Sequence, residues 1–84
     1  MKNAAYNIMP DTENILKTMG EQIKMARLRR KLSATLVAER AGISPGFLSQ
    51  VEAPGMAVGI SLSTLFLIAE ALEIPPYKLL QFDD

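Results

Sequence analysis

Hydrophobic residues recur at intervals of three and four along most of the chain, and no segment alternates strictly as a half-buried strand does. This pattern predicts an all-α protein. The first helix should follow Asp11, a suitable N-cap residue, and run to about Lys31. Its inner face is expected to consist of Ile15, Met19, Ile23 and Ala26.

Two short helices separated by a tight turn are predicted next. Ser33 is a suitable N-cap for the second helix, and Gly42 suits the left-handed residue that ends it. Ser44 followed by Pro45 is a strong start signal, because serine caps the first turn and proline fits its first position. The third helix should therefore span residues 45 to 53, with Leu48 buried.

The rest of the chain predicts a loop and two more helices. Residues 53–60 contain two glycines and a proline, and Ser61 can cap a fourth helix. The inward residues of that helix are expected to be Leu62, Leu65, Ala69 and Leu72. Two consecutive prolines end it, and a short fifth helix, residues 77 to about 81, places Leu79 or Leu80 against the core. The prediction is one five-helix domain over residues 11–84, preceded by a flexible segment, residues 1–10.

Composition excludes most catalytic chemistry. The chain has no Cys and no His, which removes disulfides, thiolate or imidazole zinc sites and Ser-His-Asp triads. The neighbouring carboxylates Glu70 and Glu73 are typical of a solvated helix face. We therefore expect no enzyme activity, no metal and no cofactor. The N-terminal residues lack the apolar core of a signal peptide, so a cytoplasmic protein is expected.

Charge is distributed unevenly along this formally neutral chain. Residues 1–40 contain eight of the nine basic side chains and four acidic ones, whereas residues 41–84 contain only Lys78 and five acidic ones. The uncharged run 53–69 is too short and too interrupted by Gly and Pro to cross a membrane. Any attraction to a polyanion must therefore come from the N-terminal half.

The segment SATLVAERAGISPGFLSQVE, residues 33–52, has the spacing of a helix-turn-helix motif. With MGEQIKMARLRRKLS before it and SLSTLFLIAEALEI after it, the chain resembles the phage Cro and cI type of helix-turn-helix regulators, the Xre family. The likeness covers about Met19 to Leu80, and the segment of residues 15–44 is also similar to the HipB-like antitoxins. It implies a lambda-repressor-like fold and a sequence-specific regulator, acting as a repressor on double-stranded DNA.

The third helix would then be the reading helix. If Leu48 and Val51 point inward, the outward positions face the DNA major groove. Gln50 can pair bidentately with adenine, Ser49 can serve several bases, and Gly46 permits close approach. Pro45 or Phe47 can contact a thymine methyl group. The alternative is that these are merely exposed helix residues.

Phosphate contacts are expected from helix N-termini and nearby cations. The candidates are Arg29, Arg30, Lys31, Ser33, Thr35, Arg40 and Ser44. The alternative is an ordinary solvated face at a helix C-terminus. Ala34 replaces the glutamine common in the family, and no Lys or Arg occurs from residue 41 to 77. Binding should therefore be modest, with a shallow salt dependence.

The resemblance also implies a structural ion pair between Arg27 and Glu52, which would hold the reading helix in place. Homodimerisation on a pseudo-palindromic site is expected, because one small domain supplies little affinity. The expected dimer interface, called the seam below, consists of Leu67, Tyr77, Leu80 and Phe82. The alternative is that these four residues pack beneath the chain end.

A second hypothesis is a protein-interaction module that binds a toxin or another partner protein, with DNA binding secondary. It depends on Met25 and Leu28, which lie opposite the inner stripe of the first helix, and on Leu36, where an exposed polar residue is usual. The N-terminal Tyr6, Ile8 and Met9 could cover that patch instead.

Overall fold

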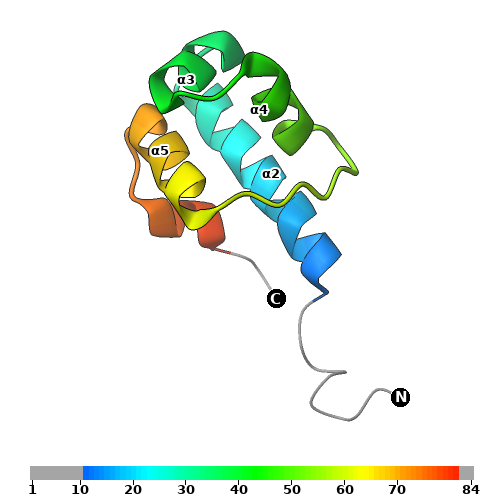
Figure 1. The fold of residues 1–84 in the computed structure, drawn as a ribbon. Coiled ribbons are helices and arrows are strands. Elements are labelled where there is room, and N and C mark those ends of the chain that lie inside the picture. The colour runs from blue at the N-terminus through cyan, green and yellow to red at the C-terminus, as the bar shows by residue number, and fades with distance from the viewer. Residues whose placement is uncertain (1–10, 82–84) are drawn as a thin grey trace, which may run out of the picture.

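The longest helix, α2 (Thr12–Arg29), runs along one side of a group of shorter helices (Figure 1). These are α3 (Ala34–Ala41), α4 (Pro45–Glu52) and α5 (Leu62–Leu72), followed by the 3₁₀ helix η1 (Pro76–Leu80). The computed structural model describes residues 11–81, and within that range it contains no strand. The all-α prediction is confirmed, whereas the predicted flexible segment, residues 1–10, lies outside the described residues.

Each α-helix begins at a side-chain cap that the sequence predicted. Ser33 Oγ accepts a hydrogen bond from the Leu36 N–H at 3.1 Å, and Ser44 Oγ accepts one from the Phe47 N–H at 3.0 Å. Asp11 and Ser61 cap α2 and α5 in the same way. Capping satisfies one of the unpaired N–H groups in each first turn and fixes where the helix starts.

The ends of the helices follow a different local rule. Three helices end at a residue in the left-handed region: Lys31 (φ 57°), Gly42 (φ 72°) and Glu73 (φ 59°). Just beyond each of these, a backbone N–H bonds back to a carbonyl five residues earlier, as in Leu32 to Arg27 at 3.1 Å. The first helix, predicted to run to about Lys31, ends at Arg29, because the left-handed turn at Lys31 interrupts the helical hydrogen bonds.

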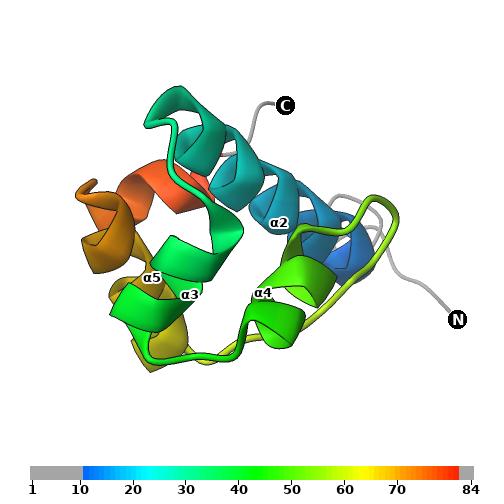
Figure 2. The ribbon, with the colours of Figure 1, turned by 90° about the horizontal axis from the view of Figure 1, so that it is seen from above.

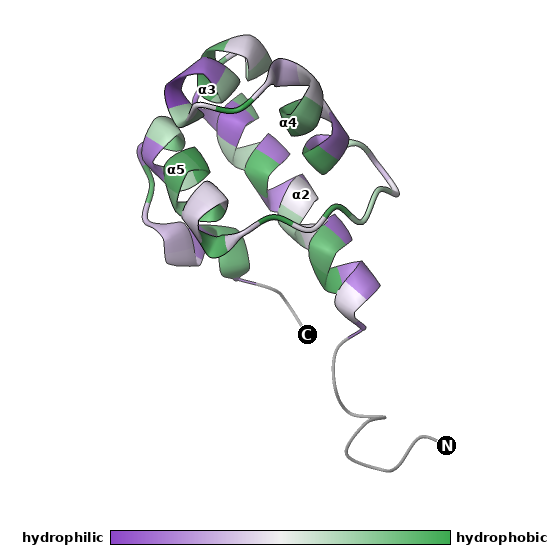
Figure 3. Ribbon diagram, viewed as in Figure 1, coloured by the Kyte–Doolittle hydropathy of each residue, from purple (hydrophilic) through white to green (hydrophobic). Residues whose placement is uncertain are grey.

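The core lies between α2, α3, α4 and α5. Its most deeply buried large side chains are Ile23, Val37, Leu48, Val51, Leu65, Ile68, Leu72 and Leu79. The view from above shows α3 and α4 side by side in front of α2 (Figure 2). Hydropathy follows this arrangement, since α2 alternates polar and apolar residues while α5 is apolar along most of its length (Figure 3).

Two predictions about the C-terminal half are wrong. Leu62, expected inward, is 65% exposed, because it is the first residue of α5 and the stripe that meets the core begins one turn later at Leu65. The expected fifth α-helix is a 3₁₀ helix, so the described residues contain four α-helices. Its hydrogen bond joins the Lys78 N–H to the Pro75 carbonyl at 3.1 Å, three residues apart, and Pro76 has no N–H to donate. Leu79 supplies its buried side chain.

No helix in the part of the chain that the structure describes is both long and apolar enough to cross a membrane.

Candidate nucleic-acid interface

A nearly buried ion pair joins the end of α4 to α2. The Arg27 guanidinium donates to Glu52 through Nη2–Oε1 at 2.8 Å and Nε–Oε2 at 3.0 Å, and the two side chains are 12% and 6% exposed. Arg27 Nη1 also donates to the Leu32 carbonyl at 2.9 Å. One side chain therefore connects α2, the turn before α3 and the last residue of α4.

Electrostatics at this pair favour the charged arginine. The hydrogen bond to Glu52, helped by the negative charge of the carboxylate, raises the pKa of Arg27 above its ordinary value, although burial acts in the opposite direction. With its partners in place, the pair leaves no unsatisfied polar atom at this position among the described residues. The end of α4 is thus fixed by a satisfied, charge-assisted contact.

Helix α4 presents one face to the core and the other to solvent. Leu48 and Val51 are buried, whereas Gly46, Ser49 and Gln50 are exposed, as the spacing predicts. Pro45 is exposed at the leading end. Phe47 is different, because it is partly buried and packs against the core, so its ring has less freedom to meet a ligand than the sequence suggested.

The N-termini of α3 and α4 flank this exposed face. Ser33 and Ser44 are exposed, and their hydroxyls are occupied as caps. Among residues 11–81, the first-turn N–H groups of Thr35 and Gly46 have no hydrogen-bond partner. Such groups, at the positive end of a helix dipole, can bind an anion.

Two of the arginines predicted to bind phosphate contact the end of α5. Arg30 donates to the Glu73 carbonyl at 2.8 Å and pairs with the Glu73 carboxylate at 3.1 Å. Arg40 donates to the Ala71 carbonyl at 3.3 Å. Cations are favourable at a helix C-terminus, where carbonyl groups lack partners. These contacts hold α5 against the ends of α2 and α3.

Arg29 is exposed near the end of α2. It lines a cavity of about 210 Å³ together with Arg30, Lys78 and three other residues, Gln22, Ala26 and Ile74. The structure therefore brings Lys78 beside Arg29 and Arg30, a grouping that the sequence did not predict. Lys31 is exposed at the turn before Ser33 and forms no ion pair with another described residue.

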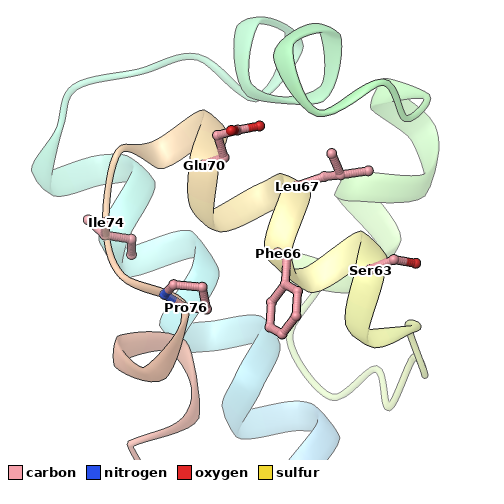
Figure 4. A pocket seen from close by; sticks show the side chains of 6 residues that line it. All are labelled: Ser63, Phe66, Leu67, Glu70, Ile74 and Pro76. Carbon is pink, nitrogen blue, oxygen red and sulfur yellow. The ribbon is translucent and has the colours of Figure 1, made fainter.

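The predicted seam residues are accessible where the structure describes them. Leu67, Tyr77 and Leu80 are each about half exposed, and Phe82 lies outside the described residues. Beside Leu67 an open cavity of about 600 Å³ runs between α5 and η1, with the Phe66 ring on its wall (Figure 4). Its other lining residues are Ser63, Glu70, Ile74 and Pro76. Met25 and Leu28, on α2, are also half exposed, whereas Leu36 is partly buried.

Sequence reasoning missed Gly20. This residue is buried in the middle of α2, where the carbonyl group of Val51 from α4 packs directly against it. A glycine within a regular helix, next to the predicted inner stripe, was the available signal, because glycine is disfavoured there unless another backbone must come close.

Comparison with known proteins agrees with this geometry. The family model described as helix-turn-helix (HTH_3) matches residues 23–79, which include α3, the turn and α4. The chain belongs to the helix-turn-helix family of the Cro and cI type. No curated protein matches this helix-turn-helix protein.

Two solved structures are similar to the helix-turn-helix protein. The restriction-modification controller protein C.AhdI from Aeromonas hydrophila is 28% identical with a TM-score of 0.70, covering 76% of this chain and 94% of its own. The hypothetical transcription factor NHTF from Neisseria is 25% identical with a TM-score of 0.73, covering 87% of this chain and 82% of its own. Neither is described as a HipB-like antitoxin, so that part of the resemblance stays a prediction.

Residues 11–81 contain no group of three or more acidic, His or Cys side chains that could hold a metal ion.

Proposed function

We propose that the protein is a sequence-specific DNA-binding regulator that represses transcription as a homodimer bound to a pseudo-palindromic operator. One observation carries the proposal. Helix α4 is anchored through Leu48, Val51 and Glu52, and it turns Ser49 and Gln50 outward with no other described residue bound to their side chains. A short, firmly held helix with free polar side chains is suited to the major groove.

Base recognition would depend mainly on Gln50. Its amide can donate to adenine N7 and accept from adenine N6–H, which discriminates against other base pairs by about 1–3 kcal/mol. Ser49 can bond to several bases, and Pro45 at the leading end can contact a thymine methyl group. No Cβ contact within 4 Å would arise at Gly46, so the DNA can approach the α4 backbone closely there.

Phosphate binding would depend more on backbone dipoles than on cations. The free N–H groups of Thr35 and Gly46 lie at the N-termini of α3 and α4, and Lys31 lies just before Ser33. Arg30 and Arg40 contact the end of α5, so they contribute less counterion release than their number suggests. We infer a shallow dependence of affinity on salt concentration.

Dimerisation would use the exposed apolar face of α5 and η1. Leu67, Tyr77 and Leu80 leave apolar surface in water, and the cavity beside Phe66 offers a recess for a side chain from a second copy. A twofold dimer with two α4 helices about 34–36 Å apart would meet successive major grooves on one side of the duplex. Acting on DNA, the protein would work in the cytoplasm.

Selection of binding sites tests this function. Wild-type protein should enrich a two-part, pseudo-palindromic sequence from a pool of random duplexes, measured by sequencing the retained DNA. Gln50→Ala should lose preference at one base pair in each half-site while retaining the other positions. Asn14→Ala, which removes an exposed amide at the far end of α2, is the matched control and should select the wild-type sequence. Failure of the wild type to enrich any sequence would refute the proposal.

A further inference from the structure

Helices α2 and α4 touch backbone to backbone at Gly20. A Cβ atom placed on Gly20 would lie 2.0 Å from the carbonyl oxygen of Val51 and 3.2 Å from its carbonyl carbon. It would also lie 3.8 Å from the Cα atom of Glu52. Because the nearest atoms belong to the main chain, no change of side-chain rotamer can relieve the overlap. Any residue other than glycine must move one helix.

We infer that Gly20 is a positioning residue that sets the orientation of α4 and thereby the sequence preference of the protein. Arg27 follows Gly20 by seven residues, about 10 Å along the helix axis. Its side chain reaches Glu52, the residue next to Val51. The Gly20 contact determines how closely α4 approaches α2, and the ion pair determines its rotation.

Gln50 directly precedes Val51, so its position depends on this contact. Ordinary van der Waals contact begins near 3.4 Å, so a methyl group 2.0 Å from the Val51 oxygen is about 1.4 Å too close. The other end of α4 is held at Ser44 by its cap and by the turn from α3. A displacement confined to the C-terminal end of an eight-residue helix, about 12 Å long, tilts it by roughly 5–10°.

A shift of about 1 Å matters for bases more than for phosphates. A bidentate hydrogen bond requires donor–acceptor distances near 3 Å and good alignment, which such a tilt removes. Contacts to phosphates at the N-termini of α3 and α4 lie at the held end and should persist. This inference rests on the proposed DNA-binding function for its effect on affinity, although the tilt itself does not depend on DNA.

The test compares Gly20→Ala with Gly59→Ala in the full chain. Gly59 lies in the loop before α5, has no positive φ and would place a Cβ in open space, so it controls for the loss of a glycine. Residual dipolar couplings of backbone amides, without DNA, should show α4 tilted by about 5–10° relative to α2 in Gly20→Ala alone. An unchanged interhelical angle would overturn the inference, whatever the DNA result.

Affinity is then measured on the duplex selected by the wild type and on a scrambled duplex. Gly20→Ala should reduce the ratio of the two affinities at least tenfold and change binding to the scrambled duplex less than twofold. If Gly20→Ala keeps the wild-type ratio of affinities for the selected and the scrambled duplex, the positioning role is overturned. If wild type selects no sequence, the proposed function fails while the tilt remains measurable. If Gly20→Ala does not fold, the contact between α2 and α4 is tested in the wild-type protein. The close approach requires a nuclear Overhauser cross-peak between the Hα protons of Gly20 and Glu52, and its absence would overturn the inference.

Discussion

Replacing Arg27 with alanine should lower the free energy of unfolding by about 3–5 kcal/mol, because the carboxylate of Glu52 would stay buried without a partner. Three hydrogen bonds from Arg27 to Glu52 disappear together, and the Leu32 carbonyl loses its donor as well. Domains of this size have unfolding free energies of about 5–15 kcal/mol, so the variant loses a large fraction of its stability. The melting temperature should fall by about 12 °C or more, at roughly 4 °C or more per kcal/mol.

Urea unfolding followed by far-ultraviolet circular dichroism measures this loss, since the chain has no Trp for fluorescence. Arg30→Ala is the matched control. It removes the same side chain from a pair whose members are 42% and 67% exposed, and it should cost at most about 1 kcal/mol. The double replacement Arg27→Met with Glu52→Met should recover most of the stability, because no charge then remains buried. A loss below about 1 kcal/mol for Arg27→Ala, or one equal to that of Arg30→Ala, would refute the reasoning.

Two further predictions concern DNA affinity and assembly. Lys31→Ala should weaken binding to all duplexes alike and reduce the slope of log affinity against log salt by about one. Fluorescence anisotropy between low and physiological salt measures both effects. A loss of affinity confined to the selected duplex would contradict a phosphate contact. Leu67→Asp should convert a micromolar dimer into a monomer in sedimentation velocity, because the carboxylate would be buried in the dimer interface. Leu28→Asp, at a similarly exposed leucine of α2, should leave the dimer intact. A monomeric wild type, or a dimer that tolerates Leu67→Asp, would place the seam elsewhere.

Local chemistry explains why the helix starts could be predicted from the sequence. A capping serine and the N–H that it accepts from lie within three residues of each other, so Ser33, Ser44 and Ser61 signal their helices without knowledge of the fold. The inward face of α4 follows from helical periodicity alone. The left-handed residue at Glu73 could not be read in this way, because glutamate has no intrinsic preference for that conformation.

Long side chains and helix crossings depend on which elements meet in space. Arg30 lies among basic residues at the end of α2, and only the position of α5 shows that its guanidinium binds Glu73. In the sequence alone, Gly20 is a residue that lowers the stability of its helix, and only the position of α4 shows why glycine is required there. The closing segment has the apolar spacing of an α-helix, but a segment of five residues that begins with Pro76 forms too few hydrogen bonds to hold one. The contacts of Arg30 and Gly20 join residues distant in sequence, whereas the form of the closing segment follows from its own length and its proline.

The side chains of Ser49 and Gln50 have a consequence for how this protein can evolve. Within residues 11–81 neither forms a hydrogen bond with the rest of the chain, and both are exposed. Exchanges at such positions usually change stability by less than about 0.5 kcal/mol. Mutation can therefore explore new operator preferences at these two positions without first acquiring a compensating change in the core. Paralogues arising by gene duplication could diverge in target sequence while the buried Arg27–Glu52 pair keeps the scaffold constant.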